Sequence, residues 1–146
     1  MKYFLNFALL LFIVVSCKNT KESTSNNQTI IENDFTIAFG SCNKQWKYNP
    51  FWEEIQENNP NVWIWGGDII YSDTDDMIVL EKNYNIQKNN PEYTKFRKNV
   101  EVIGTWDDHD YGLNDGGIEY SKKAESQQLF LDFIDVSKGD KRRKQE

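Results

Sequence analysis

Histidine, cysteine and basic residues are scarce in this chain. One histidine and two cysteines occur in 146 residues, and 17 Lys and Arg residues stand against 23 Asp and Glu residues, which gives a formal net charge of -6. This acidic balance argues against nucleic acid as a partner bound through a basic face. A site that handles phosphate in such a chain would need bound metal cations to offset the negative charge.

Several familiar catalytic and binding motifs are also absent. The sequence has no Gly-x-Ser-x-Gly elbow, which weakens a Ser-His-Asp hydrolase, and no glycine-rich phosphate loop with a lysine. A calcium loop of the EF-hand kind that starts at Asp110 fails too. Its third position is Gly112, and its twelfth is Ser121, where a bidentate glutamate is needed.

The first residues form a short export signal. Lys2 precedes an apolar run from Phe4 to Val15 that is too short to span a bilayer comfortably and ends in Val-Val-Ser-Cys at Cys17. This ending resembles the lipobox of bacterial lipoproteins. The resemblance implies cleavage before Cys17, a lipid on its sulfur, and anchoring to a bacterial membrane on the periplasmic or surface side. An uncleaved membrane anchor is the alternative.

Residues 17–33 are expected to form a flexible tether, because they contain almost nothing apolar that could offset the entropy of ordering. Residues 34–146 then form the folded part. Removal of residues 1–16 deletes one lysine and no acid, so the formal charge moves from -6 to -7. With Cys17 lipidated, Cys42 is an unpaired thiol in an exported protein. A Cys17–Cys42 disulfide is the structural alternative.

The start of the folded part predicts one βαβ unit. Residues 34–40 alternate large apolar and smaller side chains, as a strand does. Asn49 is the expected N-cap of a helix with Pro50 at its first position, running to about Asn58. The apolar run 62–65 then predicts a strand buried in the middle of a parallel sheet. The two strands should lie parallel, with a helical crossover between them.

The remaining pattern predicts more helices and a third strand. A helix should follow residues 72–76, a short helix should cover 91–98, and a strand should cover 100–105. A last helix over 121–136 should place apolar side chains on one side, before the chain ends in a charged run. These apolar residues are Ala124, Leu129, Phe130, Leu131, Phe133 and Ile134.

Polar residues follow each predicted strand where it ends. Cys42 follows the first strand, Asp68 and Tyr71 the second, and residues 107–110 the third. Carboxyl ends of parallel strands share one rim of a sheet, so these groups should converge there. Thiolate, phenolate, carboxylate and imidazole are ligands that suggest more than one bound ion. Asp68 as a turn cap with Tyr71 over the sheet edge is the structural alternative.

His109 is the sole histidine. A lone histidine is usually a structural hydrogen-bonding group. Flanked by Asp107, Asp108 and Asp110 at a strand end, it becomes a candidate proton donor or a group that orients a phosphoryl oxygen. The surrounding carboxylates favour its charged form.

Three motifs in this order resemble the alkaline phosphatase D (PhoD-like) family, relatives of the calcineurin-like metallophosphatases. They are Phe39-Gly40-Ser41-Cys42, Gly67-Asp68-Ile69-Ile70-Tyr71 and the segment from Thr105 to Asp115. The second also resembles the element that binds iron through tyrosinate in purple acid phosphatases. The resemblance implies an α/β sandwich that hydrolyses phosphate mono- or diesters at a dinuclear metal site.

The resemblance also implies roles for individual residues. Cys42 and Tyr71 would bind Fe(III), Asp68 would bridge to a second ion, in this family Ca²⁺, and Asp108 would bind that second ion. His109 would lie near the leaving oxygen. Asn114 is a further candidate for phosphate or metal contact. Asp107 would contact the metal ligands without binding a metal itself.

The sequence departs from the family pattern near its end. The family domain has a second set of strands and later ligands, whereas this chain ends in a charged run without another histidine. We therefore expect a truncated, partial sandwich with parallel strands and helical crossovers, an incomplete metal site and an exposed sheet edge. A non-catalytic lipoprotein that binds calcium is the competing expectation.

Overall fold

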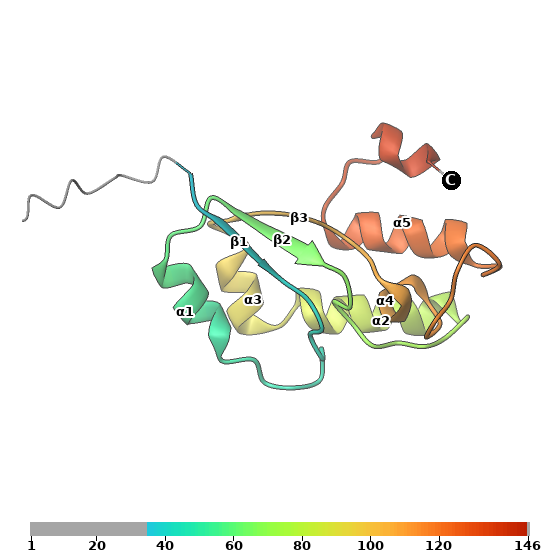
Figure 1. The fold of residues 1–146 in the computed structure, drawn as a ribbon, viewed down its shortest axis with the longest axis horizontal. Helices are drawn as coiled ribbons and strands as arrows, with labels where there is room; N and C mark the ends of the chain where they lie inside the picture. The colour runs from blue at the N-terminus through green and yellow to red at the C-terminus, as the bar shows by residue number, and fades with distance from the viewer. Residues whose placement is uncertain (1–34, 146) are drawn as a thin grey trace, which may run out of the picture. The chain divides into compact units, whose positions relative to one another are not determined.

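The computed structural model describes residues 35–145 (Figure 1). The predicted signal peptide, the predicted tether and the predicted lipidation site Cys17 lie outside the described residues. The described part is an α/β fold around a parallel sheet of three strands in the order β1-β2-β3. The strands are β1 (Ile37–Gly40), β2 (Val62–Gly66) and β3 (Glu101–Thr105), so β2 is central as predicted. In the described part, no helix has the length and apolar character needed to cross a membrane.

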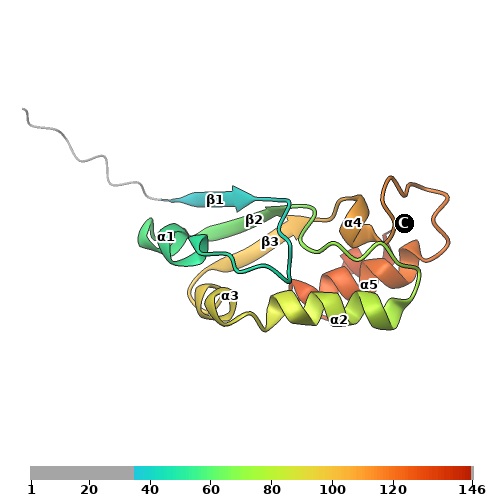
Figure 2. The same cartoon turned by 90° about the horizontal axis from the view of Figure 1, so that it is seen from below.

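Helices connect the strands and lie together on one side of the sheet (Figure 2). α1 (Phe51–Glu57) connects β1 to β2, and α2 (Met77–Lys88) and α3 (Pro91–Phe96) connect β2 to β3. This arrangement confirms parallel strands with helical crossovers. After β3 come α4 (Asp108–Tyr111), α5 (Lys123–Phe133) and the 3-10 helix η1 (Lys141–Lys144).

An aromatic cluster holds the sheet against the helices. Trp52 of α1 is buried, and its ring centroid lies 5.2 Å from that of Trp63 and 5.6 Å from that of Trp65, both edge to face. Such pairs add about 0.5–1.5 kcal/mol each beyond the burial of their area. Trp65 Nε1 donates a hydrogen bond of 3.0 Å to the hydroxyl of Tyr93. This packing holds β2 in place and thereby positions the turn that follows it, which carries Asp68.

Two helices differ from the sequence-based expectation, α1 in its N-cap and α5 in its buried face. Pro50 is the N-cap of α1, one position later than expected, while Asn49 Oδ1 still accepts the N–H of Phe51 at 3.0 Å. In α5, Ala124 is exposed and Ser126 is fully buried, so the predicted apolar face was wrong at its first turn. Ser126 is tolerated inside because its hydroxyl donates to the carbonyl of Tyr111.

The other side of the sheet is open in the described part of the chain. Phe39 pairs with Ile64 and Ile64 with Ile103, which places the three side chains in one row across the sheet. Phe39 is 80% exposed and Ile103 is 38% exposed. In Figure 2, α2, α3 and α5 lie on the opposite side of the sheet.

Candidate metal centre

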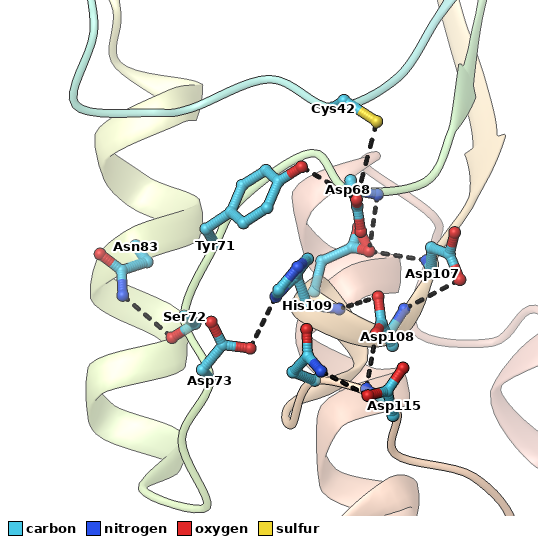
Figure 3. A network of polar contacts seen from close by, with 12 residues as sticks. Cys42, Asp68, Tyr71, Ser72, Asp73, Asn83, Asp107, Asp108, His109 and Asp115 are labelled. Atoms are coloured by element: carbon cyan, nitrogen blue, oxygen red, sulfur yellow. Dashed lines mark hydrogen bonds and ion pairs between the residues drawn. The ribbon is translucent and has the colours of Figure 1, made fainter.

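The three strand ends bring their polar side chains to one rim (Figure 3). Cys42 lies just after β1, and Asp68 and Tyr71 lie just after β2. The hydroxyl of Tyr71 donates to Asp68 Oδ2 at 3.0 Å, and Cys42 Sγ lies 3.7 Å from the same oxygen. The predicted convergence of a thiol, a phenol and a carboxylate is therefore present in the structure.

A second group of ligand atoms also includes Asp68. One atom each from Asp68, Asp108 and His109 lie within 4.8 Å of one another. The first and third strand ends thus meet at the carboxylate that follows the central strand. Asp68 belongs to both groups, which is the position that a bridging ligand would need.

The Asp68 carboxylate is almost entirely buried, and only one of its two oxygens has a hydrogen-bond partner. The residue is 9% exposed, and its Oδ1 is buried without a hydrogen-bond partner among the described residues. A buried oxygen with no partner costs free energy, so such an atom calls for an explanation. A bound cation would supply the missing partner. The donor set of sulfur, phenol and carboxylate oxygens therefore fits a pair of metal ions.

The backbone around Asp68 adopts conformations that few residues favour. Cys42 has φ 57° and Asp68 has φ 51°, both in the left-handed region. Gly67 has φ 96°, and a Cβ on it would lie 2.5 Å from the Cβ of Asp107. Glycine is needed there because the turn after β2 and the segment after β3 touch. Strained backbone of this kind gathers at functional sites.

Asp108 begins α4, a short helix where the sequence indicated only a polar cluster after the third strand. Asp107 caps this helix, and its side chain accepts the N–H of Asp108 at 3.0 Å. Asp108 accepts the N–H of Asp115 at 2.6 Å and the N–H of His109 at 2.9 Å. The bond from Asp115 is the main cause that holds the pKa of Asp108 below its ordinary value. Asp108 is therefore a carboxylate at neutral pH.

The ring of His109 is held between two partners. Its Nδ1 lies 2.7 Å from Asp73 Oδ1, and its ring centroid lies 4.1 Å from that of Tyr71. Burial alone lowers the pKa of His109, but the hydrogen bond and charge of Asp73 outweigh it and raise the pKa above 6.5. Asp73 was not among the predicted site residues. It was assigned only to the start of α2, and a partner 36 residues away leaves no local signal.

Tyr71 carries its proton in the absence of a cation. Burial, followed by its hydrogen bonds to Asp68 and Cys42, raises its pKa well above 10.0. Lys44 Nζ lies 5.2 Å from the centre of its ring. Binding of a cation by the phenol oxygen would therefore release a proton.

Asp110 is the most deeply buried acid next to the site. Its side chain is 0% exposed, and it accepts N–H groups from Asp68 at 3.0 Å, from Ile69 at 3.2 Å and from Asp107 at 2.7 Å. Burial raises the pKa of its carboxyl to about 7, and the three N–H groups act in the opposite direction. In the sequence, Asp110 stood out only as the start of a rejected calcium loop and as one of the acids around His109.

Asn114 is not drawn into the cluster. Its side-chain amide donates to Asp115 Oδ2 at 2.6 Å, in the exposed turn after α4. Its expected contact with phosphate or metal stays a prediction. The side chain of Asp107 contacts the backbone N–H of Asp108, and its expected supporting role also stays a prediction.

No protein family, curated protein or solved structure matches the chain. A function for the chain has to be derived from the chemistry of the site.

Proposed function

We propose that the chain is the amino-terminal part of a metal-dependent phosphoesterase that resembles alkaline phosphatase D and hydrolyses phosphate mono- or diesters. The partial sheet would then belong to a calcineurin-like α/β sandwich. The observation that carries the proposal is the shared position of Asp68. Its Oδ2 is in contact with Tyr71 and Cys42, while the same side chain is grouped with Asp108 and His109.

Each residue has a role that its contacts support. Cys42, Tyr71 and Asp68 offer sulfur and oxygen to Fe(III), a choice that a thiolate and a phenolate favour. Asp68 and Asp108 offer oxygens to Ca²⁺, the hard ion that carboxylates favour. The free oxygen of Asp68 is the atom most in need of a cation.

When bound, two such cations supply positive charge for the phosphoryl oxygens and lower the pKa of a water that attacks phosphorus. The chain supplies the proton donor. His109 is held by Asp73, which favours its protonated form and fixes the direction of its ring. His109 can therefore donate its proton to the leaving oxygen.

The proposal includes a place for the enzyme. A lipid on Cys17 would anchor it to a bacterial membrane, and phosphate esters outside the cytoplasm would be its substrates.

A second candidate is a lipoprotein that binds calcium without catalysis. It is favoured by the single histidine of the chain and by the exposed acids Asp73, Asp107 and Asp115 around the cluster. Ca²⁺ needs carboxylate and carbonyl oxygens, which these acids supply.

Metal content and turnover separate the two candidates. The protein is loaded with iron and calcium, its metals are measured after dialysis, and hydrolysis of p-nitrophenyl phosphate and bis(p-nitrophenyl) phosphate is followed. Stoichiometric iron with turnover supports the phosphoesterase, and calcium alone without turnover in the full-length protein supports the binder. Cys42→Ala should abolish iron binding, whereas Ser137→Ala, at an exposed position after α5, should leave it unchanged. Unchanged iron in Cys42→Ala would count against the enzyme.

A further inference from the structure

One buried carboxylate links the two segments that carry the ligands. Asp110 lies on α4, two positions after Asp108, yet its side chain reaches the turn after β2. Its Oδ2 accepts the N–H of Asp68 at 3.0 Å and the N–H of Asp107 at 2.7 Å, while Oδ1 accepts the N–H of Ile69 at 3.2 Å. A single side chain therefore holds both the β2 end and the β3 end by their backbones.

Asp110 is fixed from its other side as well. Its carbonyl oxygen accepts the hydroxyl of Tyr84 at 2.9 Å, and Tyr84 is buried on α2. Asp110 is not part of the group formed by Asp68, Asp108 and His109. It is 0% exposed, and both of its side-chain oxygens accept backbone N–H groups. Its contacts connect α2, α4 and the turn after β2.

The candidate ligands on the two sides of Asp110 are far apart in the sequence, so the chain itself does not keep them close. Asp68 and the pair Asp108 and His109 come from different strand ends, about 40 residues apart in sequence. Asp68 also has φ 51°, a conformation that needs outside support. The N–H bond from Asp68 to Asp110 provides that support.

We propose that Asp110 is a positioning residue that sets the spacing between Asp68 and the Asp108–His109 pair by holding the turn after β2 against the start of α4. This inference rests on the proposed metal centre for its effect on metal affinity. The positioning itself is a property of the metal-free chain. Groups behind metal ligands typically change metal affinity about 10- to 100-fold when they are replaced.

Asp110→Asn is the most direct variant, because it keeps the shape and replaces one acceptor oxygen with an N–H donor. Whichever way the amide faces, at least one of the three backbone N–H groups loses its acceptor. We expect affinity for Ca²⁺, measured by calorimetric titration, to fall by about 10- to 100-fold while the circular dichroism spectrum is kept.

Tyr93→Phe is the matched control. It also removes one buried hydrogen bond, from Trp65 Nε1, but in the aromatic cluster rather than at the strand ends. Its Ca²⁺ affinity should equal that of the unmodified protein. Gly67→Ala is a second variant, and it replaces neither a ligand residue nor Asp110. The added Cβ would lie 2.5 Å from the Cβ of Asp107, too close for two carbon atoms. The variant should therefore push the turn after β2 away from the segment after β3 and weaken Ca²⁺ binding too.

Amide hydrogen exchange without metal keeps the test independent of the proposed function. The N–H groups of Asp68, Ile69 and Asp107 should be protected together and should lose protection together in Asp110→Asn, with the β2 amides unchanged. If the protein binds no Ca²⁺, the proposed metal centre fails and this exchange result alone decides the positioning role. Retained protection in Asp110→Asn, or unchanged Ca²⁺ affinity once protection is lost, would overturn the inference.

Discussion

The hydroxyl of Tyr71 donates a 3.0 Å hydrogen bond to Oδ2 of Asp68, three residues earlier on the same turn. The two side chains therefore present their oxygens side by side at the end of the central strand. Cys42 Sγ lies 3.7 Å from the same Asp68 oxygen, so the contact joins two strand ends. The predictions about metal binding begin from this contact.

Tyr71→Phe should weaken Fe(III) binding. The variant keeps the ring against His109 but removes the phenol oxygen, and loss of even an outer-shell partner costs about 10- to 100-fold in metal affinity. Because the pKa of Tyr71 is raised, iron must displace its proton, so Fe(III) affinity should increase with pH in the unmodified protein. The slope of affinity against pH should be smaller in Tyr71→Phe. Equal slopes would show that the phenol is not a ligand.

Asp73→Asn should lower the pKa of His109 towards 6.5. The hydrogen bond and charge of Asp73 favour the imidazolium form, and burial opposes it. A raised pKa in the folded state adds stability that is fully present below pH 6.5 and is lost as the pH rises through the folded pKa. Because His109 is the sole histidine, one imidazole signal in an NMR titration reports the change.

Asp75→Asn is the control for this titration. Asp75 lies in the same loop and is exposed, and it does not contact His109 by a hydrogen bond. It should leave the imidazole titration unchanged. A His109 pKa that is the same in Asp73→Asn and in the unmodified protein would contradict the assigned pairing.

Asp132→Asn should remove part of the stability at neutral pH but not in acid. Burial raises the pKa of Asp132, but its bonds to Lys138 and Arg143 outweigh burial, so the folded pKa lies below 3.8. The carboxylate therefore stabilises the fold above pH 3.8, and this contribution is lost as the pH falls through the folded pKa. Solvent screening limits it to about 1 kcal/mol or less.

Urea unfolding at two pH values tests this contribution. The free energy of unfolding of Asp132→Asn should lie below that of the unmodified protein at pH 7, and the difference should shrink in strong acid. Glu81→Gln, at an exposed position on α2, is the control and should show no difference at either pH. A difference that persists below the folded pKa would refute the ion-pair account.

Phe39→Ser should reduce self-association of the protein. Phe39 is 80% exposed in a row with Ile64 and Ile103 on the open side of the sheet, and exposed apolar rows of this kind promote association. Sedimentation velocity at several concentrations measures the effect. Ile118→Ser is the matched control, since Ile118 is 86% exposed but lies in the loop before α5. Equal effects of the two variants would show that general surface hydrophobicity, rather than this row, drives association.

The parts of the fold that the sequence predicted are those with strong local patterns. The apolar run before Gly66 predicted the central strand. The short helix expected over 91–98 is present as α3, where Asn90 Oδ1 accepts the N–H of Tyr93. The meeting of Cys42 and Asp68 followed from parallel strands alone, because their ends share a rim.

The remaining features depend on contacts between distant residues. α4 has four residues, too few to show a helical period, so the sequence indicated only a polar cluster there. Ser126 is buried because it meets Tyr111, 15 residues earlier. Asp73 and Asp110 are ordinary acids in sequence, and their roles appear only through His109 and the turn after β2. No local pattern distinguishes them from the other acids of this acidic chain.

Metal stoichiometry in three variants tests the central claim, that Asp68 serves two cation sites. After loading with iron and calcium, Cys42→Ala should lose iron alone, Asp108→Ala should lose calcium alone, and Asp68→Ala should lose both. Retention of one full equivalent of either metal in Asp68→Ala would contradict a shared ligand and, with it, the proposed dinuclear centre.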